Sequence, residues 1–111
     1  MNTCGWIRGY LAKSLSTYAF LKHVVSTLAN EFECKGSIEV RKASYIIHLG
    51  DLQICLSKPV CREAHTKGGY CLDRMILIEL ENAGLVYEYS RSQYIRYCHG
   101  IFFRRQNGTV Y

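Results

Sequence analysis

The sequence predicts a single α+β domain in which helices pack against a small antiparallel sheet. Two observations carry this prediction. The apolar residues follow helical spacing before Gly36, alternate between Gly36 and Pro59, and follow helical spacing again after Pro59. A glycine that ends a helix, Gly84, is then followed directly by two alternating stretches, which predict a C-terminal β-hairpin.

Length and composition limit the classes of protein that the chain can belong to. The 111 residues are 49% hydrophobic and 21% charged, which excludes a disordered or collagen-like chain and favours one domain over residues 1–111. The longest apolar run falls well short of the roughly 20 residues that span a bilayer, and the N-terminus lacks the apolar core of a secretory signal. We therefore expect a cytoplasmic protein, complete from Met1, that does not enter membranes.

The N-terminal part predicts helices. Ser16 or Thr17 can cap a helix, and the apolar residues that follow recur on one face of it. An earlier set recurs at helical spacing too and predicts a short helix over residues 5–14. The longer helix carries Leu21, Val24, Val25, Leu28 and Phe32, and the shorter one Trp6, Ile7, Tyr10 and Leu11.

Period-two patterning predicts three strands in the middle of the chain. They cover residues 37–41, 45–49 and 52–56, and Gly50-Asp51 forms a two-residue turn between the last two. Two-residue turns join antiparallel neighbours, so we expect an antiparallel sheet.

Two helices are predicted next. Pro59 fits the first position of a short helix that reaches about His65, since the N–H that proline lacks has no helical partner there. Gly68-Gly69 forms a tight link, and a longer helix over residues 70–83 ends at Gly84.

The C-terminal part predicts a hairpin and an extended end. Residues 85–89 and 94–98 alternate and would be its two strands, with a polar turn between them. Residues 101–105 predict a last extended segment, and residues 106–111 a frayed tail.

This order of elements is that of a winged-helix fold, in which the terminal hairpin is the wing. The stretches GSIEVRKASYIIHLGDLQICLS and KPVCREA, followed by a helix that ends in ENAGLV, resemble the C-terminal winged-helix domain of large conjugative relaxases from plasmids and integrative elements. The resemblance covers residues 20–103 and implies an accessory role in DNA binding for a protein of a mobile element or phage. The histidine metal cluster and the nucleophilic tyrosine of relaxases are missing, so it does not imply their catalysis.

Basic residues concentrate at the C-terminal end. The net charge is +5, yet residues 1–88 hold ten basic and nine acidic groups, whereas four arginines and no acid follow Glu88. Arginine and tyrosine side chains together suit a nucleic-acid groove, because arginine binds phosphate and tyrosine stacks on bases. The candidate binding residues are Lys58, Arg62, Lys67, Arg74, Arg91, Tyr94, Arg96, Arg104 and Arg105.

These candidates differ in how well packing explains them. Arg91 lies at the predicted wing tip, where we expect it to contribute little to packing, whereas Tyr87 and Tyr97 are better explained as packing residues. The predicted recognition helix offers only Arg74 among basic residues, so we expect phosphate contacts to dominate over base-specific contacts.

A protein partner is the alternative to DNA. Arginine and aromatic side chains dominate the binding energy of protein interfaces. The same residues would then bind and inhibit a host nucleoprotein complex, as anti-CRISPR and other anti-defence proteins do.

The sequence predicts no enzyme, cofactor, metal or disulfide. It holds no phosphate-binding loop, dinucleotide fingerprint, nucleophile elbow or zinc-protease motif. Six irregularly spaced cysteines without a C-x-x-C pair or an export signal favour free thiols over a zinc site or a disulfide scaffold. Cys61 and His65 lie four apart on one helix, which permits contact, but we expect no catalysis from them.

Overall fold

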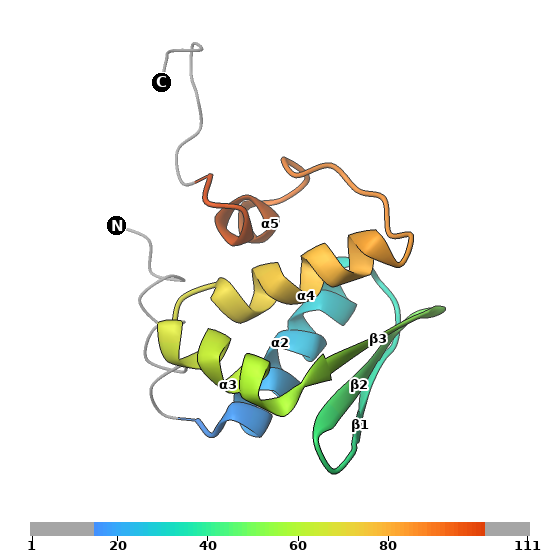
Figure 1. The fold of residues 1–111 in the computed structure, drawn as a ribbon. Helices are drawn as coiled ribbons and strands as arrows, with labels where there is room; N and C mark the ends of the chain where they lie inside the picture. The colour runs from blue at the N-terminus through green and yellow to red at the C-terminus, as the bar shows by residue number, and fades with distance from the viewer. Residues whose placement is uncertain (1–14, 102–111) are drawn as a thin grey trace.

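The computed structural model describes residues 15–101 (Figure 1). The predicted helix over residues 5–14, the C-terminal segment beyond Ile101 and the frayed tail lie outside this range. The described elements follow in the order α2 (Thr17–Glu31), β1 (Gly36–Val40), β2 (Ser44–Leu49), β3 (Leu52–Ser57), α3 (Lys58–Lys67), α4 (Cys71–Asn82) and α5 (Gln93–Cys98). The prediction of an α+β fold is confirmed.

The sheet is an antiparallel meander with the strand order β1-β2-β3. All three predicted strands are confirmed, as is the tight turn between β2 and β3. Leu49 pairs with Leu52 across that turn, and Gly50 has a φ of 60°, a conformation that glycine adopts at little cost. The register places alternate residues on one face, which is the pattern that the sequence shows.

One face of the sheet is buried and the other is open. The buried face carries Tyr45, Ile47 and Leu49 of β2 with Ile54 and Leu56 of β3. The open face carries smaller and polar side chains, including Ser37, Glu39, His48, Gln53 and Cys55. The charged groups of the sheet therefore stay in solvent while its branched aliphatic side chains enter the core.

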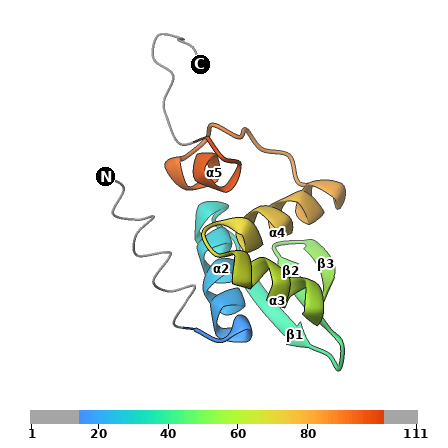
Figure 2. The ribbon, with the colours of Figure 1, turned by 60° about the vertical axis from the view of Figure 1, so that its left-hand side comes forward.

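Helices α2, α3 and α4 cover the buried face, and α5 lies against α4 on the side away from the sheet (Figures 1 and 2). The core between these layers is mostly aliphatic, with the buried rings of Phe20 from α2 and Tyr45 from β2. Its fully buried members include Phe20, Leu21, Leu28, Ile47, Leu72, Ile76, Leu77, Leu80 and Ile95.

The predicted start of α2 near Ser16 and the predicted end of α4 at Gly84 are confirmed. The hydroxyl of Ser16 accepts a hydrogen bond from the amide of Ala19, and that of Ser57 caps α3 in the same way. At the end of α4, the amides of Gly84 and Leu85 donate to the carbonyls of Glu81 and Leu80. This is a Schellman motif, and Gly84, with a φ of 119°, occupies its left-handed position.

The predicted C-terminal wing hairpin is wrong. Residues 85–89 form no strand, and residues 94–98, predicted as its returning strand, belong to α5. Residues 85–88 do keep an in-and-out alternation, with Leu85 and Tyr87 against the core and Val86 exposed. They pack as a loop segment that pairs with no strand among residues 15–101.

A local capping signal explains the helix. The hydroxyl of Ser92 accepts a hydrogen bond from the amide of Ile95, 3.1 Å away, and Ile95 and Cys98 are buried three residues apart on one helix face. The aromatic and β-branched residues of YIRYC favour a strand by composition, but burial of Ile95 and Cys98 against α4 outweighs that preference.

Close packing at Gly36 gives the first testable prediction. A Cβ at this position would lie 2.9 Å from Cγ1 of Val25 and 3.2 Å from Cβ of Ala29, both on α2. We expect Gly36→Ala to lower the free energy of unfolding by about 1–3 kcal/mol because α2 and β1 must separate. Urea denaturation measures this change. Ser37→Ala, at the exposed neighbouring position, should leave stability nearly unchanged, and equal stability of the two variants would contradict the prediction.

Candidate nucleic-acid interface

The candidate binding residues fall into two groups. Lys58, Arg62 and Lys67 lie on α3 and Arg74 on α4, whereas Arg91, Tyr94 and Arg96 lie in α5 or just before it. Arg104 and Arg105 lie outside the described residues. The two groups differ in whether their side chains form hydrogen bonds within the protein.

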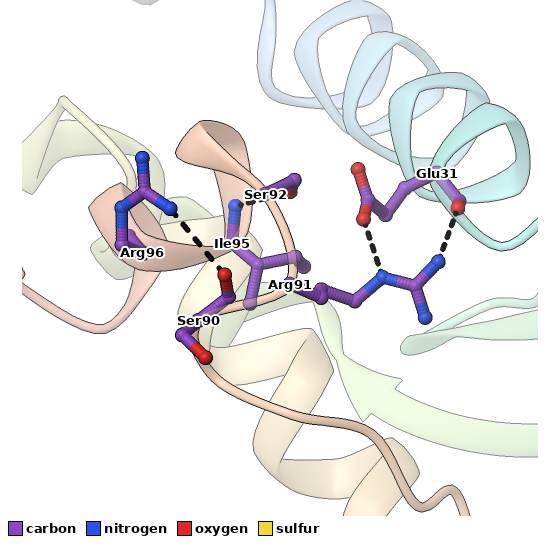
Figure 3. Close-up of polar contacts among 6 residues, drawn as sticks. All are labelled: Glu31, Ser90, Arg91, Ser92, Ile95 and Arg96. Atoms are coloured by element: carbon purple, nitrogen blue, oxygen red, sulfur yellow. Dashed lines mark hydrogen bonds and ion pairs between the residues drawn. The ribbon is translucent and has the colours of Figure 1, made fainter.

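Arg91, in the segment before α5, forms hydrogen bonds to Glu31 at the end of α2 (Figure 3). Its Nε donates to Oε2 of Glu31 at 2.7 Å, and its Nη2 donates to the carbonyl oxygen of Glu31 at 3.1 Å. The guanidinium also lies 4.7 Å from the ring centre of Phe32. The expectation that Arg91 occupies a wing tip and contributes little to packing is therefore wrong.

Arg96 and Tyr94 are engaged within the protein too. Nη1 of Arg96 donates to the carbonyl oxygen of Ser90 at 3.3 Å, which holds the turn that precedes α5 (Figure 3). The hydroxyl of Tyr94 donates to the carboxyl group of Asp73, which is completely buried on α4. Together with Arg91, these contacts fix α5 and the segment before it onto α2 and α4.

The cations of α3 and α4 are placed differently. Arg62, Lys67 and Arg74 are exposed and form no hydrogen bond or ion pair within residues 15–101. Lys58 begins α3, and its Nζ lies 5.4 Å from the ring centre of Tyr45. Arg62 and Lys67 lie about 140° apart around the helix axis, so they flank α3 on different sides.

A shallow groove runs between α3 and α4. Its volume is about 270 Å³, and Lys67 and Arg74 lie beside mostly apolar side chains in its lining. Val60 and Ile78, two of these, are 44% and 42% exposed. The lining is Val60, Glu63, Ala64, Lys67, Cys71, Arg74, Met75 and Ile78.

A second groove, of about 500 Å³, lies between α4 and α5. Arg74 and Cys71 line both grooves, and Tyr70 and Tyr97 line this one, with their rings 5.8 Å apart. Arg74 therefore lies between an apolar groove and an aromatic one.

A polar aromatic cluster was not anticipated from the sequence. Glu81 accepts hydrogen bonds from the hydroxyls of Tyr87, at 2.5 Å, and Tyr89, at 2.9 Å, and the ring of Tyr89 stacks on His99 at 3.7 Å. Burial and the hydrogen bond to Glu81 raise the pKa of Tyr87. The prediction that Tyr87 serves packing is confirmed by its contact with Phe32. The alternation of residues 85–89 was the signal for the cluster, but it was interpreted as a strand.

His99 should make stability depend on pH. Burial lowers the pKa of His99, whose Nε2 lies 2.8 Å from the hydroxyl of Tyr87. The unfolded chain binds a proton near pH 6.5, whereas the folded protein binds it only at lower pH. The contribution of neutral His99 to the free energy of unfolding should therefore be complete above about pH 6.5. It should decrease as the pH falls from there toward the lower pKa of the folded protein. Urea denaturation at several pH values measures this, and His99→Gln should show a smaller fall. Identical pH profiles for the two proteins would contradict it.

The cysteines and other potential metal ligands are dispersed over the described residues. Cys34, Cys55, Cys61 and Cys71 are free thiols, and no cluster of three or more potential ligands lies within residues 15–101. Burial raises the pKa of the Cys61 thiol to about 11, so it stays protonated at neutral pH and is a poor nucleophile.

His65, four residues after Cys61, bonds through Nδ1 to the hydroxyl of Thr17 at 2.9 Å and stacks on Phe20. Its ring therefore serves the contact between α2 and α3. Across residues 15–101, every helix is too short or too polar to cross a bilayer.

Fold and site together define a small α+β protein whose helices α3 and α4 carry exposed cations, without hydrogen bond or ion pair among residues 15–101, on and beside an apolar groove. Comparison of the chain with protein families, curated proteins and solved structures finds no match.

Proposed function

We propose that this chain is a small nucleic-acid-binding protein of a mobile genetic element, and that it contacts phosphates through α3 and α4. The observation that carries the proposal is the set of exposed cations on these helices, Arg62, Lys67 and Arg74, which make no hydrogen bond or ion pair within residues 15–101. Cations already paired within a protein have less to gain from phosphate, whereas unpaired cations release counterions when they bind it.

The turn between α3 and α4 is also consistent with nucleic-acid binding. Helices α3 and α4 are joined by the three residues 68–70, and both glycines of that link have positive φ. A short glycine-containing turn between two helices is typical of helix-turn-helix proteins. This part of the winged-helix prediction remains in the proposal, although the wing does not. The mobile-element origin depends on the relaxase resemblance alone, whose predicted elements between residues 36 and 65 are present.

Contacts with phosphate rather than with bases should dominate. Arg74 is the only basic residue of α4, and the other exposed side chains of that helix include Ile78 and Asn82. Helices that read base edges usually present several arginine, lysine, asparagine or glutamine side chains to the major groove. The protein should therefore bind many sequences with similar affinity.

Fluorescence anisotropy with labelled duplex DNA, single-stranded DNA and RNA at low ionic strength tests the proposal. The variants Arg62→Ala, Lys67→Ala and Arg74→Ala should each weaken binding to every sequence by a similar factor. Lys42→Ala removes an exposed lysine between β1 and β2 and is the matched control, with affinity close to that of the unaltered protein. Equal losses in the Lys42 variant would show that only net charge matters and would contradict an interface on α3–α4.

A second function is favoured by the groove between α3 and α4. Exposed Val60 and Ile78, beside Lys67 and Arg74, resemble the apolar and arginine-rich centre of a protein interface. In this alternative, the protein is an anti-defence protein that binds and inhibits a host nucleoprotein complex. Val60→Ser with Ile78→Ser should then abolish capture of that complex, whereas it should hardly change phosphate-dominated binding to DNA.

A further inference from the structure

Among the described strands, β1 lies at an edge of the sheet. At the two ends of its ladder with β2, the Gly50 amide donates to the Lys35 carbonyl at 2.8 Å, and the Arg41 amide donates to the Ser44 carbonyl at 2.9 Å. Antiparallel ladders alternate residues that face the partner strand with residues that face away. The residues of β1 that face away are therefore Gly36, Ile38 and Val40.

The outward backbone groups of these three residues have no hydrogen-bond partner within residues 15–101. An edge of this kind is a template for one more strand, because its N–H and C=O groups repeat at the spacing that another extended chain requires. Natural edges are often protected by a bulge, a proline or an inward charge. Strand β1, with the sequence GSIEV, carries no proline, and its only charge, Glu39, lies on the open face of the sheet.

A groove of about 250 Å³ lies beside this edge, between β1 and α2. One wall is an exposed stripe of α2 at four-residue spacing, Tyr18, Lys22, Ser26 and Asn30, which extends over about 18 Å of helix. The other wall is residues 36–38 of β1. An added strand would thus find backbone partners on one side and side chains of α2 on the other.

We propose that the edge of β1 and its groove bind an extended, acidic peptide segment of a partner protein by β-strand addition. The unpaired backbone groups specify an extended chain. Lys22 is the only charged side chain in the lining of the groove, and its Nζ lies 5.6 Å from the ring centre of Tyr18. A glutamate or aspartate of the added strand would pair with this ammonium group.

Charge makes two other occupants of the groove less suitable, namely a terminal segment of this chain and a second copy of it. The parts of this chain outside the described residues, 1–14 and 102–111, hold four basic residues and no acidic one, so they offer Lys22 no acidic side chain. A second copy paired antiparallel through β1 would bring two Lys22 side chains to the same pair of strands. The lining of the groove contains no acidic residue that could separate them.

Two blocked hexapeptides of alternating valine and threonine test the proposal, one with a central glutamate and one with lysine in its place. In NMR titrations, the glutamate peptide should shift the amide signals of Ile38 and Val40 and slow their hydrogen exchange. It should bind about fivefold or more tightly than the lysine peptide, and Lys22→Glu should reverse this preference. Lys42→Glu, an equal charge change outside the groove, should not.

A backbone variant tests the strand itself. Val40→Pro removes an outward N–H at a position where the side chain is 52% exposed, and proline is tolerated at sheet edges. It should weaken peptide binding about tenfold while circular dichroism stays unchanged, and Val40→Thr, which keeps the N–H, should bind normally. Shifts confined to other residues, no shift at millimolar peptide, or a β1-mediated dimer in sedimentation would overturn the proposal. None of these residues lies on α3 or α4, so this proposal and the nucleic-acid proposal can fail independently.

Discussion

Replacing Arg91 by alanine should lower the free energy of unfolding by about 1–2 kcal/mol. The side chain makes two hydrogen bonds to Glu31, whose side chain is only 13% exposed, and covers the ring of Phe32. Its loss leaves the last turn of α2 with an uncompensated carboxylate and a free carbonyl, and releases the segment that leads into α5. Urea denaturation measures the change.

A double-mutant cycle separates this pair from a general charge effect. Glu31→Gln keeps the backbone carbonyl but removes the carboxylate, so the coupling energy between Arg91→Ala and Glu31→Gln should be about 0.5 kcal/mol or more. Arg62→Ala, which removes an exposed arginine without a hydrogen bond or ion pair within residues 15–101, is the control and should change stability little. A coupling energy of zero would show that the ion pair between Arg91 and the Glu31 carboxylate does not stabilise the fold.

Replacing Tyr94 by phenylalanine should have a larger effect, a loss of about 2–4 kcal/mol. The hydroxyl of Tyr94 donates to the completely buried carboxyl group of Asp73, so its removal takes a hydrogen bond from a polar group that water does not reach. The phenyl ring still packs against Tyr70. The cost therefore comes from the lost hydroxyl rather than from a cavity.

The carboxyl group can be tested separately. In an Asp73→Asn background, Tyr94→Phe should cost less, because the buried group that loses its hydrogen-bond donor is then an amide rather than a carboxyl group. Tyr97→Phe, which removes the hydroxyl of a half-buried neighbour, is the matched control. If Tyr94→Phe leaves stability unchanged and instead weakens nucleic-acid binding, the assignment of Tyr94 to the fold is wrong.

Local signals in the sequence were sufficient for most of the fold. Ser16, Ser57 and Gly84 act within one helical turn of their own positions, and the alternation of residues 44–57 follows directly from burial of one sheet face. Residues 94–98 were wrongly predicted as a strand because five residues are too few to separate period two from helical spacing. Ser92 followed by Ile95 and Cys98 was the helical signal, but the strand propensity of tyrosine and isoleucine obscured it.

The candidate site was only partly predictable, because its contacts are distant in sequence. Arg91 and Glu31 are 60 residues apart, and Tyr94 and Asp73 are 21 apart. A cluster of arginines and tyrosines in sequence has the same appearance whether these side chains face solvent or hold elements together. The basic residues of α3 and α4 were among the candidates, but their sequence context does not distinguish them from Arg91 and Arg96, which the fold uses internally.

The salt dependence of nucleic-acid binding tests the proposed interface most directly. For duplex DNA, the logarithm of the binding constant should fall linearly with the logarithm of salt concentration, with about 0.9 in the slope for each phosphate contact. Combining Arg62→Ala, Lys67→Ala and Arg74→Ala should reduce that slope by up to about 2.7, whereas Arg91→Ala should leave it unchanged in the folded protein. An unchanged slope in the triple variant, or no salt-dependent binding of the unaltered protein to any duplex or single strand, would contradict the account.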